Sequence, residues 1–193
     1  MTDRQISLFS TAELPGRYLS QEPTLEISQE ALQSWKQRVW QYQQEIRRQP
    51  SLQQGSLFGT EPSAADIAEE IDPFRLPQQN IEFWRWKAPD AGVAALYFVI
   101  DHELPIVLYV GETIKANQRW KGEHDCKRYV LNYVSAHRSY QLPVTVNIGF
   151  WQQAPTATRS RQTLETALID KWRSPFNKEN WEFWGTPFVG GKA

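Results

Sequence analysis

The sequence is poor in cysteine. Cys126 is the only one, so neither a disulfide nor a cysteine-based zinc site can form within the chain. A chain built this way is typical of a reducing compartment, and we expect a cytoplasmic protein.

Long apolar runs and a strong charge of either sign are also missing. The longest clean apolar stretch, residues 93–100, is far shorter than the roughly 20 residues that span a membrane. The first residues lack the basic and then apolar layout of a signal peptide, and we expect no membrane association. The formal net charge of −1 argues against a generic nucleic-acid binder. Residues 90–193 nevertheless hold 12 Lys and Arg against 10 Asp and Glu, a small excess with the sign of a nucleic-acid-binding region.

Aromatic residues, in contrast, are abundant. They make up 13% of the chain, nine of them Trp, and hydrophobic residues make up 40%. This composition favours a folded core over general disorder. A length of 193 residues is enough for one compact domain and an extension.

The N-terminal half is predicted to be loop and helix. Residues 1–27 are polar and interrupted by prolines, which predicts loop or disorder. Apolar residues recur at near-helical spacing from Ser28 to Arg48 and predict an amphipathic helix. Ser63 is expected to cap a short acidic helix over Ala64–Ile71. An irregular, aromatic-rich segment follows from Phe74 to Trp86.

The C-terminal half alternates between strand-like and helix-like segments. Strands are expected at 94–100, 106–110 and 144–151, and the link 102–105 is short enough for a hairpin. Helices are expected at 115–123, at 127–138 and from Thr158 or Ser160 to Trp172. The predicted fold is α/β of the α+β kind: a small three-stranded antiparallel sheet flanked by helices, with a helical and partly disordered N-terminal extension.

Five polar residues of the C-terminal half follow one another at characteristic distances. The set consists of Tyr97, Tyr109 in the triplet Tyr109-Val110-Gly111, Arg119 ten residues later, Glu165, and Asn177 twelve residues after Glu165. Their order and spacing resemble the GIY-YIG nuclease family over residues 94–180. Only the tyrosine of the first family triplet is kept, since Ala95 replaces its glycine, and Val110 replaces the isoleucine of the second.

The resemblance implies a metal-dependent endonuclease that hydrolyses DNA phosphodiester bonds. Glu165 would hold one Mg²⁺ or Mn²⁺ ion, because a hard cation on a carboxylate neutralises the scissile phosphate. Arg119 would stabilise the developing negative charge with its planar set of donors. One of Tyr97 and Tyr109 would act as base while the other positions water or phosphate, and we favour Tyr97 as the base.

His124 also belongs to the expected site, Asn177 has a supporting role in it, and Glu112 is a departure from the family pattern. His124 follows Arg119 by five residues and resembles the helix histidine of the family, which would donate to phosphate or help deprotonate water. Asn177 is expected to tie the site together by hydrogen bonds. Glu112 follows the second triplet directly, where a carboxylate would repel phosphate unless it pairs with Lys115 or joins the metal.

Each residue also has a purely structural interpretation. Buried strand tyrosines are usually core residues, and Glu165 could form an ion pair with Arg161 one helical turn earlier. The alternative function is a catalytically weak or inactive DNA-binding or clamp-adaptor protein with the GIY-YIG fold. An RNA nuclease is a third possibility, since nothing in the residues distinguishes RNA from DNA.

The N-terminal half contains the peptide Gln-x-x-Leu-Phe twice. The two copies place Gln5, Leu8 and Phe9, and Gln54, Leu57 and Phe58, at the same relative positions. Both resemble the motif that binds the bacterial DNA polymerase sliding clamp, in which Leu and Phe fill an apolar pocket and Gln makes polar contacts. Two copies would gain avidity on a ring with several sites; chance, or packing of the Phe side chains on the 28–48 helix, is the alternative.

These observations predict three regions and one role. Residues 1–27 would be a flexible clamp-binding segment, 28–89 a helical extension and linker with the second motif, and 90–193 the nuclease domain. A chain of this size has little room for a domain that reads sequence, so we expect structure-selective cleavage of DNA in replication or repair.

Overall fold

The computed structural model describes residues 27–48, 62–80, 93–114 and 125–189. A four-stranded antiparallel sheet of order β1-β4-β2-β3 forms the centre of these ranges. The strands are β1 (Gln78–Asn80), β2 (Ala95–Asp101), β3 (Ile106–Thr113) and β4 (Val146–Trp151). The helices are α1 (Gln29–Arg48), α2 (Ala64–Glu70), α4 (Asp125–Ser139), α5 (Thr158–Trp172) and α6 (Trp181–Trp184), with short 3-10 turns at Pro73–Arg75, Lys178–Asn180 and Pro187–Val189.

The α+β class is confirmed, but the sheet has four strands where three were expected. The additional strand, β1, pairs antiparallel with β4 through Gln78, Gln79 and Asn80. It lies in the segment that we expected to be irregular. Its three residues are all polar, so they show none of the apolar alternation by which a strand is recognised.

Most helix boundaries agree with the sequence patterns. α1 spans the predicted amphipathic segment, and Ser63 forms a full capping box with Asp66 at the start of α2. β3 continues three residues beyond the predicted end at Val110. The predicted helix at 115–123 lies outside the described residues, as do residues 1–26. No described helix has the length and apolarity needed to cross a membrane.

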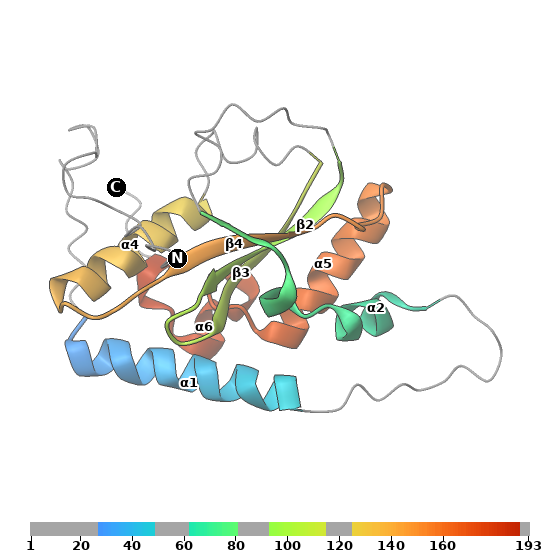
Figure 1. Cartoon of the computed structure of the whole chain (residues 1–193). Coiled ribbons are helices and arrows are strands. Elements are labelled where there is room, and N and C mark those ends of the chain that lie inside the picture. The colour runs from blue at the N-terminus through green and yellow to red at the C-terminus, as the bar shows by residue number, and fades with distance from the viewer. Residues whose placement is uncertain (1–26, 49–61, 81–92, 115–124, 190–193) are drawn as a thin grey trace, which may run out of the picture.

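Helices cover both faces of the sheet (Figure 1). On one face, here called the α1/α4 face, side chains of α1 and α4 pack with the aromatic C-terminal segment around Val99 and Ile148. On the other, the α2/α5 face, α2 and α5 pack against Phe98 and Val110. On the α1/α4 face, α1 contributes Leu32, Trp35 and Val39, each at most 3% exposed. α1 therefore shares a core with residues 93–189.

The free edge of β3 is covered without another strand. The Phe176 N–H donates to the Leu108 carbonyl at 2.9 Å. The side chain of Gln43 bonds to Val107, and that of Asn177 bonds to Val110. Two carboxamides and one backbone amide thus take the place of a neighbouring strand, which protects an otherwise open edge.

Candidate active site and the polar cluster at the other end of the sheet

Tyr97 and Tyr109 lie next to each other on the α1/α4 face. Tyr97 belongs to β2 and is completely buried, whereas Tyr109 belongs to β3 and is partly exposed. Their ring centroids are 5.9 Å apart, with an angle of 31° between the ring planes. Phe150 of β4 flanks Tyr97 at 6.0 Å between centroids. Phenols from two strands therefore form one cluster.

Gly111 provides the space in which both phenols fit. It pairs directly with Tyr97 across the two strands. A Cβ atom at this position would lie 2.5 Å from the Tyr97 hydroxyl oxygen and 2.8 Å from Cε1 of Tyr109, closer than non-bonded atoms pack. The glycine of the second triplet is therefore required by a close approach of side chains to the backbone. We call Tyr97, Tyr109 and Gly111 the tyrosine cluster.

Asn177 holds the backbone between Tyr109 and Gly111. Its buried Oδ1 accepts a hydrogen bond from the Val110 N–H at 3.0 Å, and its Nδ2 donates to the Val110 carbonyl at 2.9 Å. The Ser174 hydroxyl donates to the same Oδ1 at 2.6 Å. A carboxamide is the one side chain that offers a donor and an acceptor in this arrangement. The Asn177 side chain thus bonds to Val110 of β3 and to Ser174 of its own turn.

Glu112 is paired with Arg161. The guanidinium of Arg161, only 2% exposed, donates through Nε to the Glu112 carboxylate at 2.5 Å. It also donates to the carbonyls of Pro155 and Thr156 at 3.0 Å each. The sequence suggested Lys115 as partner of Glu112, and Lys115 lies outside the described residues. A buried cation therefore compensates the carboxylate that would otherwise repel phosphate.

Glu165 lies on α5, one helical turn after Arg161. Residues four apart share a helix face, and Leu164 and Leu168 of the same helix pack against the sheet that carries Val110. The Glu165 side chain is partly exposed. Arg161, one turn earlier, forms an ion pair with Glu112 of β3.

Several predicted site residues lie outside the described residues. Arg119 and His124 are among them, so the structure gives no position for the predicted cation and imidazole. The same holds for the two sliding-clamp-like peptides with Gln5, Leu8, Phe9, Gln54, Leu57 and Phe58. Among the described residues, the structure brings together Tyr97, Tyr109 and Gly111, with Asn177 behind them.

A single carboxylate is the metal ligand that the sequence predicts. Within the described ranges, no three or more His, Cys, Asp and Glu side chains are grouped so that they could hold a metal ion. Mg²⁺ commonly takes one or two protein carboxylates and completes its shell with water and phosphate oxygens. Glu165 is a partly exposed carboxylate of this type, but α5 packs on the α2/α5 face, whereas the tyrosine cluster lies on the α1/α4 face.

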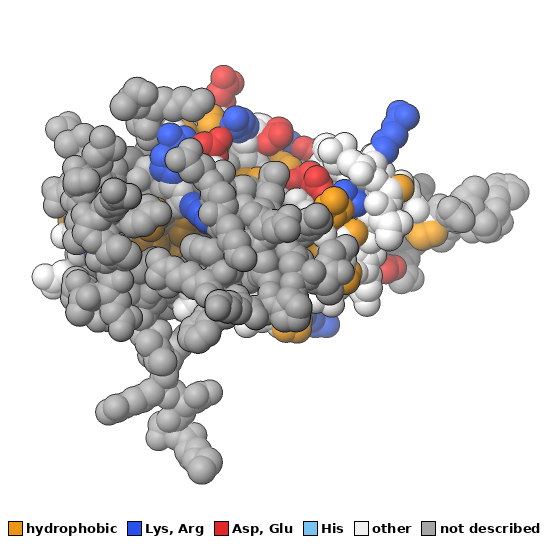
Figure 2. All heavy atoms as spheres, turned by 90° about the horizontal axis from the view of Figure 1, so that it is seen from above, with side chains coloured by type: hydrophobic (Ala, Val, Ile, Leu, Met, Phe, Trp, Pro, Cys, Tyr) orange, Lys and Arg blue, Asp and Glu red, His pale blue; other side chains and the backbone are white. Residues whose placement is uncertain are grey.

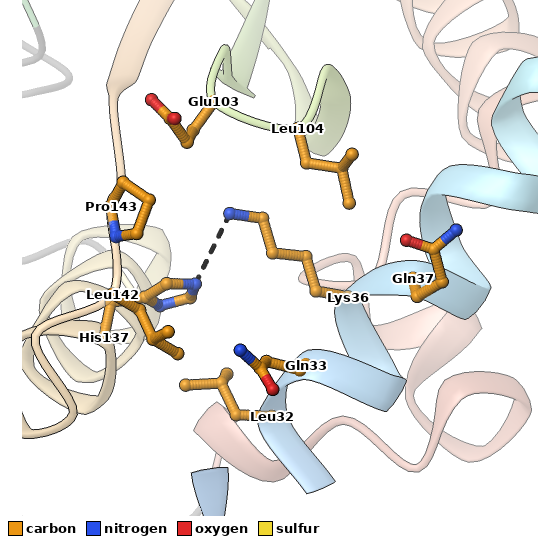
Figure 3. Close-up of a pocket in the computed structure, with 9 residues that line it drawn as sticks. All are labelled: Leu32, Gln33, Lys36, Gln37, Glu103, Leu104, His137, Leu142 and Pro143. Atoms are coloured by element: carbon orange, nitrogen blue, oxygen red, sulfur yellow. Dashed lines mark hydrogen bonds between the residues drawn. The ribbon is translucent and has the colours of Figure 1, made fainter. Parts of the chain in front are cut away.

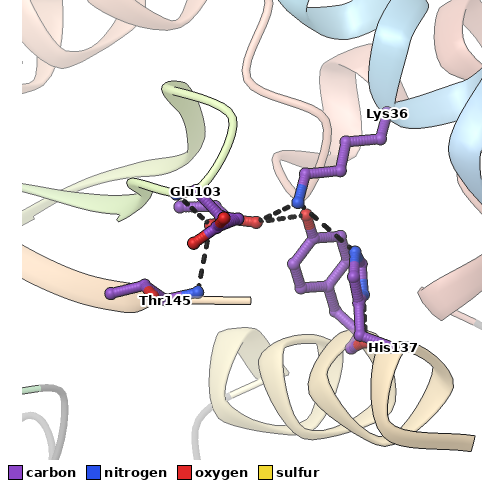
Figure 4. Close-up of polar contacts among 6 residues, drawn as sticks. Lys36, Glu103, His137 and Thr145 are labelled. Atoms are coloured by element: carbon purple, nitrogen blue, oxygen red, sulfur yellow. Dashed lines mark hydrogen bonds and ion pairs between the residues drawn. The ribbon is translucent and has the colours of Figure 1, made fainter. Parts of the chain in front are cut away.

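A second group of polar side chains lies at the hairpin end of the sheet. We call Lys36, Asp101, Tyr133 and His137 the Asp101 cluster (Figure 4). Asp101 is completely buried at the end of β2. Its Oδ2 accepts hydrogen bonds from Lys36 Nζ and from the Tyr133 hydroxyl, both at 2.7 Å. Its Oδ1 accepts from the N–H groups of Glu103 at 2.9 Å and Thr145 at 3.2 Å.

The hydrogen bonds of His137 define its tautomer. Nδ1 lies 2.8 Å from the Tyr133 carbonyl, which can only accept, so Nδ1 carries the hydrogen. Nε2 then presents a lone pair to the Lys36 ammonium 3.5 Å away. Burial lowers the pKa of His137, which keeps this imidazole neutral. Burial and the Asp101 carboxylate raise the pKa of Tyr133 well above its ordinary value, so its hydroxyl stays a donor.

A cavity of about 340 Å³ adjoins the Asp101 cluster (Figure 3). It lies between α1, the β2–β3 hairpin and the segment after α4, with Leu104 and Leu142 in its wall. Lys36 and His137 reach into it from opposite sides (Figure 3). Lys36 pairs with the Asp101 carboxylate, and His137 is bonded to Lys36 and to the Tyr133 carbonyl. The charges of Lys36 and Asp101 beside the cavity therefore compensate each other.

The sequence patterns did not identify the roles of Lys36, Gln43 and Arg161. Lys36 and Gln43 both lie in the apolar stripe of α1, four residues after Leu32 and Val39 respectively. A polar residue at such a position is a usable signal, because it must find a buried partner. The identity of that partner depends on tertiary structure.

Charge is mixed on the described part of the face that is seen from above. In the view from above, basic and acidic side chains of the described residues lie interspersed (Figure 2). This agrees with the net charge of −1 for the whole chain. Local placement of cations thus matters more for nucleic-acid binding than overall charge.

The chain matches no protein-family model, and comparisons with curated proteins and with solved structures found no significant match. The resemblance to the GIY-YIG family therefore rests on the residue pattern of the sequence.

Proposed function

We propose that this protein is a metal-dependent DNA endonuclease of the GIY-YIG type. The observation that carries the proposal is the convergence of the Tyr97 and Tyr109 phenols over Gly111, from two paired strands. Two phenols that act on one phosphate must lie side by side, as Tyr97 and Tyr109 do here. The hydrogen bonds of Asn177 to Val110 keep the strand that carries Tyr109 in place.

Accessibility distinguishes the two tyrosines. Tyr97 is completely buried, whereas Tyr109 is partly exposed. A group that exchanges a proton with the attacking water must come within hydrogen-bond reach of it. We therefore assign the base to Tyr109 and the orienting role to Tyr97, the reverse of the assignment favoured from sequence. A free tyrosine has a pKa near 10, so the phenol needs a cation beside it, and Arg119 is the candidate.

Glu165 would hold the divalent ion, and Arg119 would stabilise the developing charge on the phosphate. When bound, Mg²⁺ or Mn²⁺ would neutralise the scissile phosphate and support the leaving oxygen. Pairing of Glu112 with Arg161 compensates the negative charge at the end of β3. His124 would serve as an additional donor to phosphate.

Cleavage assays test this proposal. Purified protein with Mg²⁺ or Mn²⁺ should nick branched or partly single-stranded DNA, and Glu165→Gln should abolish cleavage while DNA binding is retained. Asp170→Asn is the matched control, because Asp170 is an exposed carboxylate on the same helix. Full activity of Glu165→Gln would exclude the proposed metal ligand. Parallel assays on RNA of the same shape decide the substrate.

The rival function is DNA binding or clamp adaptation without catalysis. Ala95 and Glu112 are two departures from the family pattern, and they favour this rival. In the structure Ala95 is a buried strand residue opposite Thr113, and Glu112 has a buried partner, so both substitutions are accommodated. DNA binding without cleavage, across several metals and substrates, would support the rival.

We further infer that the sliding clamp recruits the nuclease to replication or repair intermediates. The support is the repeated Gln-x-x-Leu-Phe peptide in the sequence. A pull-down of a bacterial clamp should succeed with the wild-type chain and fail when both Leu8-Phe9 and Leu57-Phe58 are changed to Ala-Ala. Retention of the clamp by the quadruple variant would disprove recruitment through these peptides.

A further inference from the structure

The alternation of side chains along β3 changes at one point. Val107 and Val110 pack on the α2/α5 face, whereas Leu108 and Tyr109 both pack on the α1/α4 face. The strand register shows the cause: Val107 pairs with Ile100 and Tyr109 with Val99, which leaves Leu108 as an extra residue. This is a β-bulge.

The bulge decides which face Tyr109 occupies. In a regular strand, residues two apart share a face, so Tyr109 would lie with Val107 on the α2/α5 face. The extra residue Leu108 turns Tyr109 to the opposite face, where Tyr97 lies. Formation of the tyrosine cluster therefore requires the bulge, as well as the right residues in β2 and β3.

A buried carboxamide from α1 holds one side of this bulge. Gln43 is 0% exposed. Its Oε1 accepts from the Val107 N–H at 2.7 Å, and its Nε2 donates to the carbonyls of Val107 at 3.0 Å and Trp172 at 2.8 Å. On the other side, Asn177 bonds in the same two-way manner to Val110. Tyr109 lies between the two residues held by these carboxamides.

We propose that Gln43 is a positioning residue for Tyr109, and that α1 is thereby part of the catalytic apparatus. The proposal rests on the nuclease function proposed above. Val107 lies on the edge strand beside the bulge, so its N–H and carbonyl have no neighbouring strand to bond to, and a buried unpaired N–H or carbonyl is costly. Gln43 supplies those partners at Val107 and links them to the end of α5 through Trp172.

Lys36 provides an internal control for a merely structural role of α1. It lies two helical turns before Gln43 on the same face of the helix, and it is similarly buried. It contacts Asp101 and His137 rather than the bulge. Loss of Lys36 should loosen α1 without moving Tyr109.

The experiment compares Gln43→Met and Lys36→Met in the full chain, at a temperature where circular dichroism shows both to be folded. We expect Gln43→Met to lower kcat by about 10- to 100-fold with KM within twofold, and Lys36→Met to lower Tm with kcat unchanged. Should Gln43→Met not fold, Gln43→Asn, which keeps the amide but shortens it, takes its place with the same expected loss. Wild-type kcat in the Gln43 variant, or equal losses in both variants, would overturn the proposal.

Chemical labelling of Tyr109 separates this proposal from the nuclease function. Nitration of tyrosines, located by mass spectrometry, reports the exposure of each phenol whether or not the protein cleaves DNA. We expect the nitration of Tyr109 to change at least threefold in Gln43→Met and to stay constant in Lys36→Met. An inactive wild-type chain with this labelling pattern would disprove the nuclease function alone. Unchanged labelling of Tyr109 in the Gln43 variant would disprove the positioning role.

Discussion

The tyrosine cluster and the Asp101 cluster lie at opposite ends of β2 on the same face of the sheet, and they differ in solvent access. Asp101 is completely buried, and it receives two side-chain and two backbone hydrogen bonds. In the tyrosine cluster, Tyr97 is equally buried but the neighbouring Tyr109 is partly exposed. One end of the sheet is closed, and the other keeps a phenol at the surface.

In the proposed nuclease, this difference would separate the groups that anchor the fold from the groups that act on the phosphate. A buried charge is tolerated only when it is paired and hydrogen-bonded, and Asp101 meets that condition with groups from α1, α4, the hairpin and the segment before β4. Such a cluster fixes elements in place but has no group left to act on a ligand. A catalytic group must instead be accessible, so its position has to be fixed through the backbone. Asn177 and Gln43 do this for β3.

The largest expected loss of stability and activity comes from Gly111→Ala in the tyrosine cluster. The added methyl would collide with the Tyr97 phenol and the Tyr109 ring. We expect a loss of about 2–3 kcal/mol in the free energy of unfolding, as for overpacked cores. Cleavage should fall by roughly 100-fold, because a displacement on the order of 1 Å is enough. Urea unfolding and cleavage rates measure the two effects.

Gly149→Ala is the matched control for that substitution. A Cβ at Gly149 in β4 would lie 2.8 Å from Gln78 Nε2, which donates to the Pro73 and Leu76 carbonyls, and 3.2 Å from Leu76 Cβ. Stability should therefore fall here as well, but these contacts lie away from the tyrosine cluster, so cleavage should stay near the wild-type rate. Equal losses of activity in the two alanine variants would show that the close packing at Gly111 has no special relation to the site.

A smaller effect is expected from Arg161→Gln. The variant leaves the Glu112 carboxylate without its buried cation, next to Gly111. We expect a stability loss of about 1–2 kcal/mol and weaker DNA binding in a filter or anisotropy assay, because the carboxylate then repels phosphate. Adding Glu112→Gln should restore the binding. Arg159→Gln, on the exposed surface of the same helix, controls for the loss of one positive charge. If the Arg161→Gln/Glu112→Gln double variant binds DNA as weakly as Arg161→Gln, the explanation is contradicted.

Much of the fold could be predicted from the sequence because its elements carry periodic patterns. The stripe of Leu32, Trp35 and Val39 predicts α1, and the apolar run of β2 predicts a buried strand. β1 was not predicted because its three residues are all polar and show no apolar alternation. Pairing with β4 stabilises this edge strand. The four-stranded sheet is therefore a product of tertiary pairing.

The candidate site was predictable only as a set of residues. Spacing identified Tyr97, Tyr109 and Asn177, but the bulge at Leu108 that brings both phenols to one face leaves no mark in the apolar pattern. Gln43 was visible as a polar residue within an apolar stripe, and its partner Val107 was not. Contacts between residues distant in the chain depend on how the helices pack, which local patterns do not contain.

The smallest expected effect is a pH dependence of the free energy of unfolding, which arises from His137 in the Asp101 cluster. Burial lowers the pKa of His137, so below its unfolded pKa of about 6.5 the unfolded chain takes up a proton before the folded chain does. His137 therefore contributes its full stability above that pH, and the contribution is lost as the pH falls further. Protonated Nε2 would also face the Lys36 ammonium. The free energy of unfolding of the wild type should fall more steeply between pH 7 and 5 than that of His137→Gln.

The difference in slope cannot exceed about 1.4 kcal/mol per pH unit for one proton. Burial lowers the pKa of His102 as well, but His102 is present in both chains and cancels in the comparison. Urea titrations at a series of pH values measure the slopes. Parallel slopes would mean that the neutral imidazole does not support the Asp101 cluster, and that this end of the sheet is anchored by the Lys36–Asp101 pair and the Tyr133 hydroxyl without it.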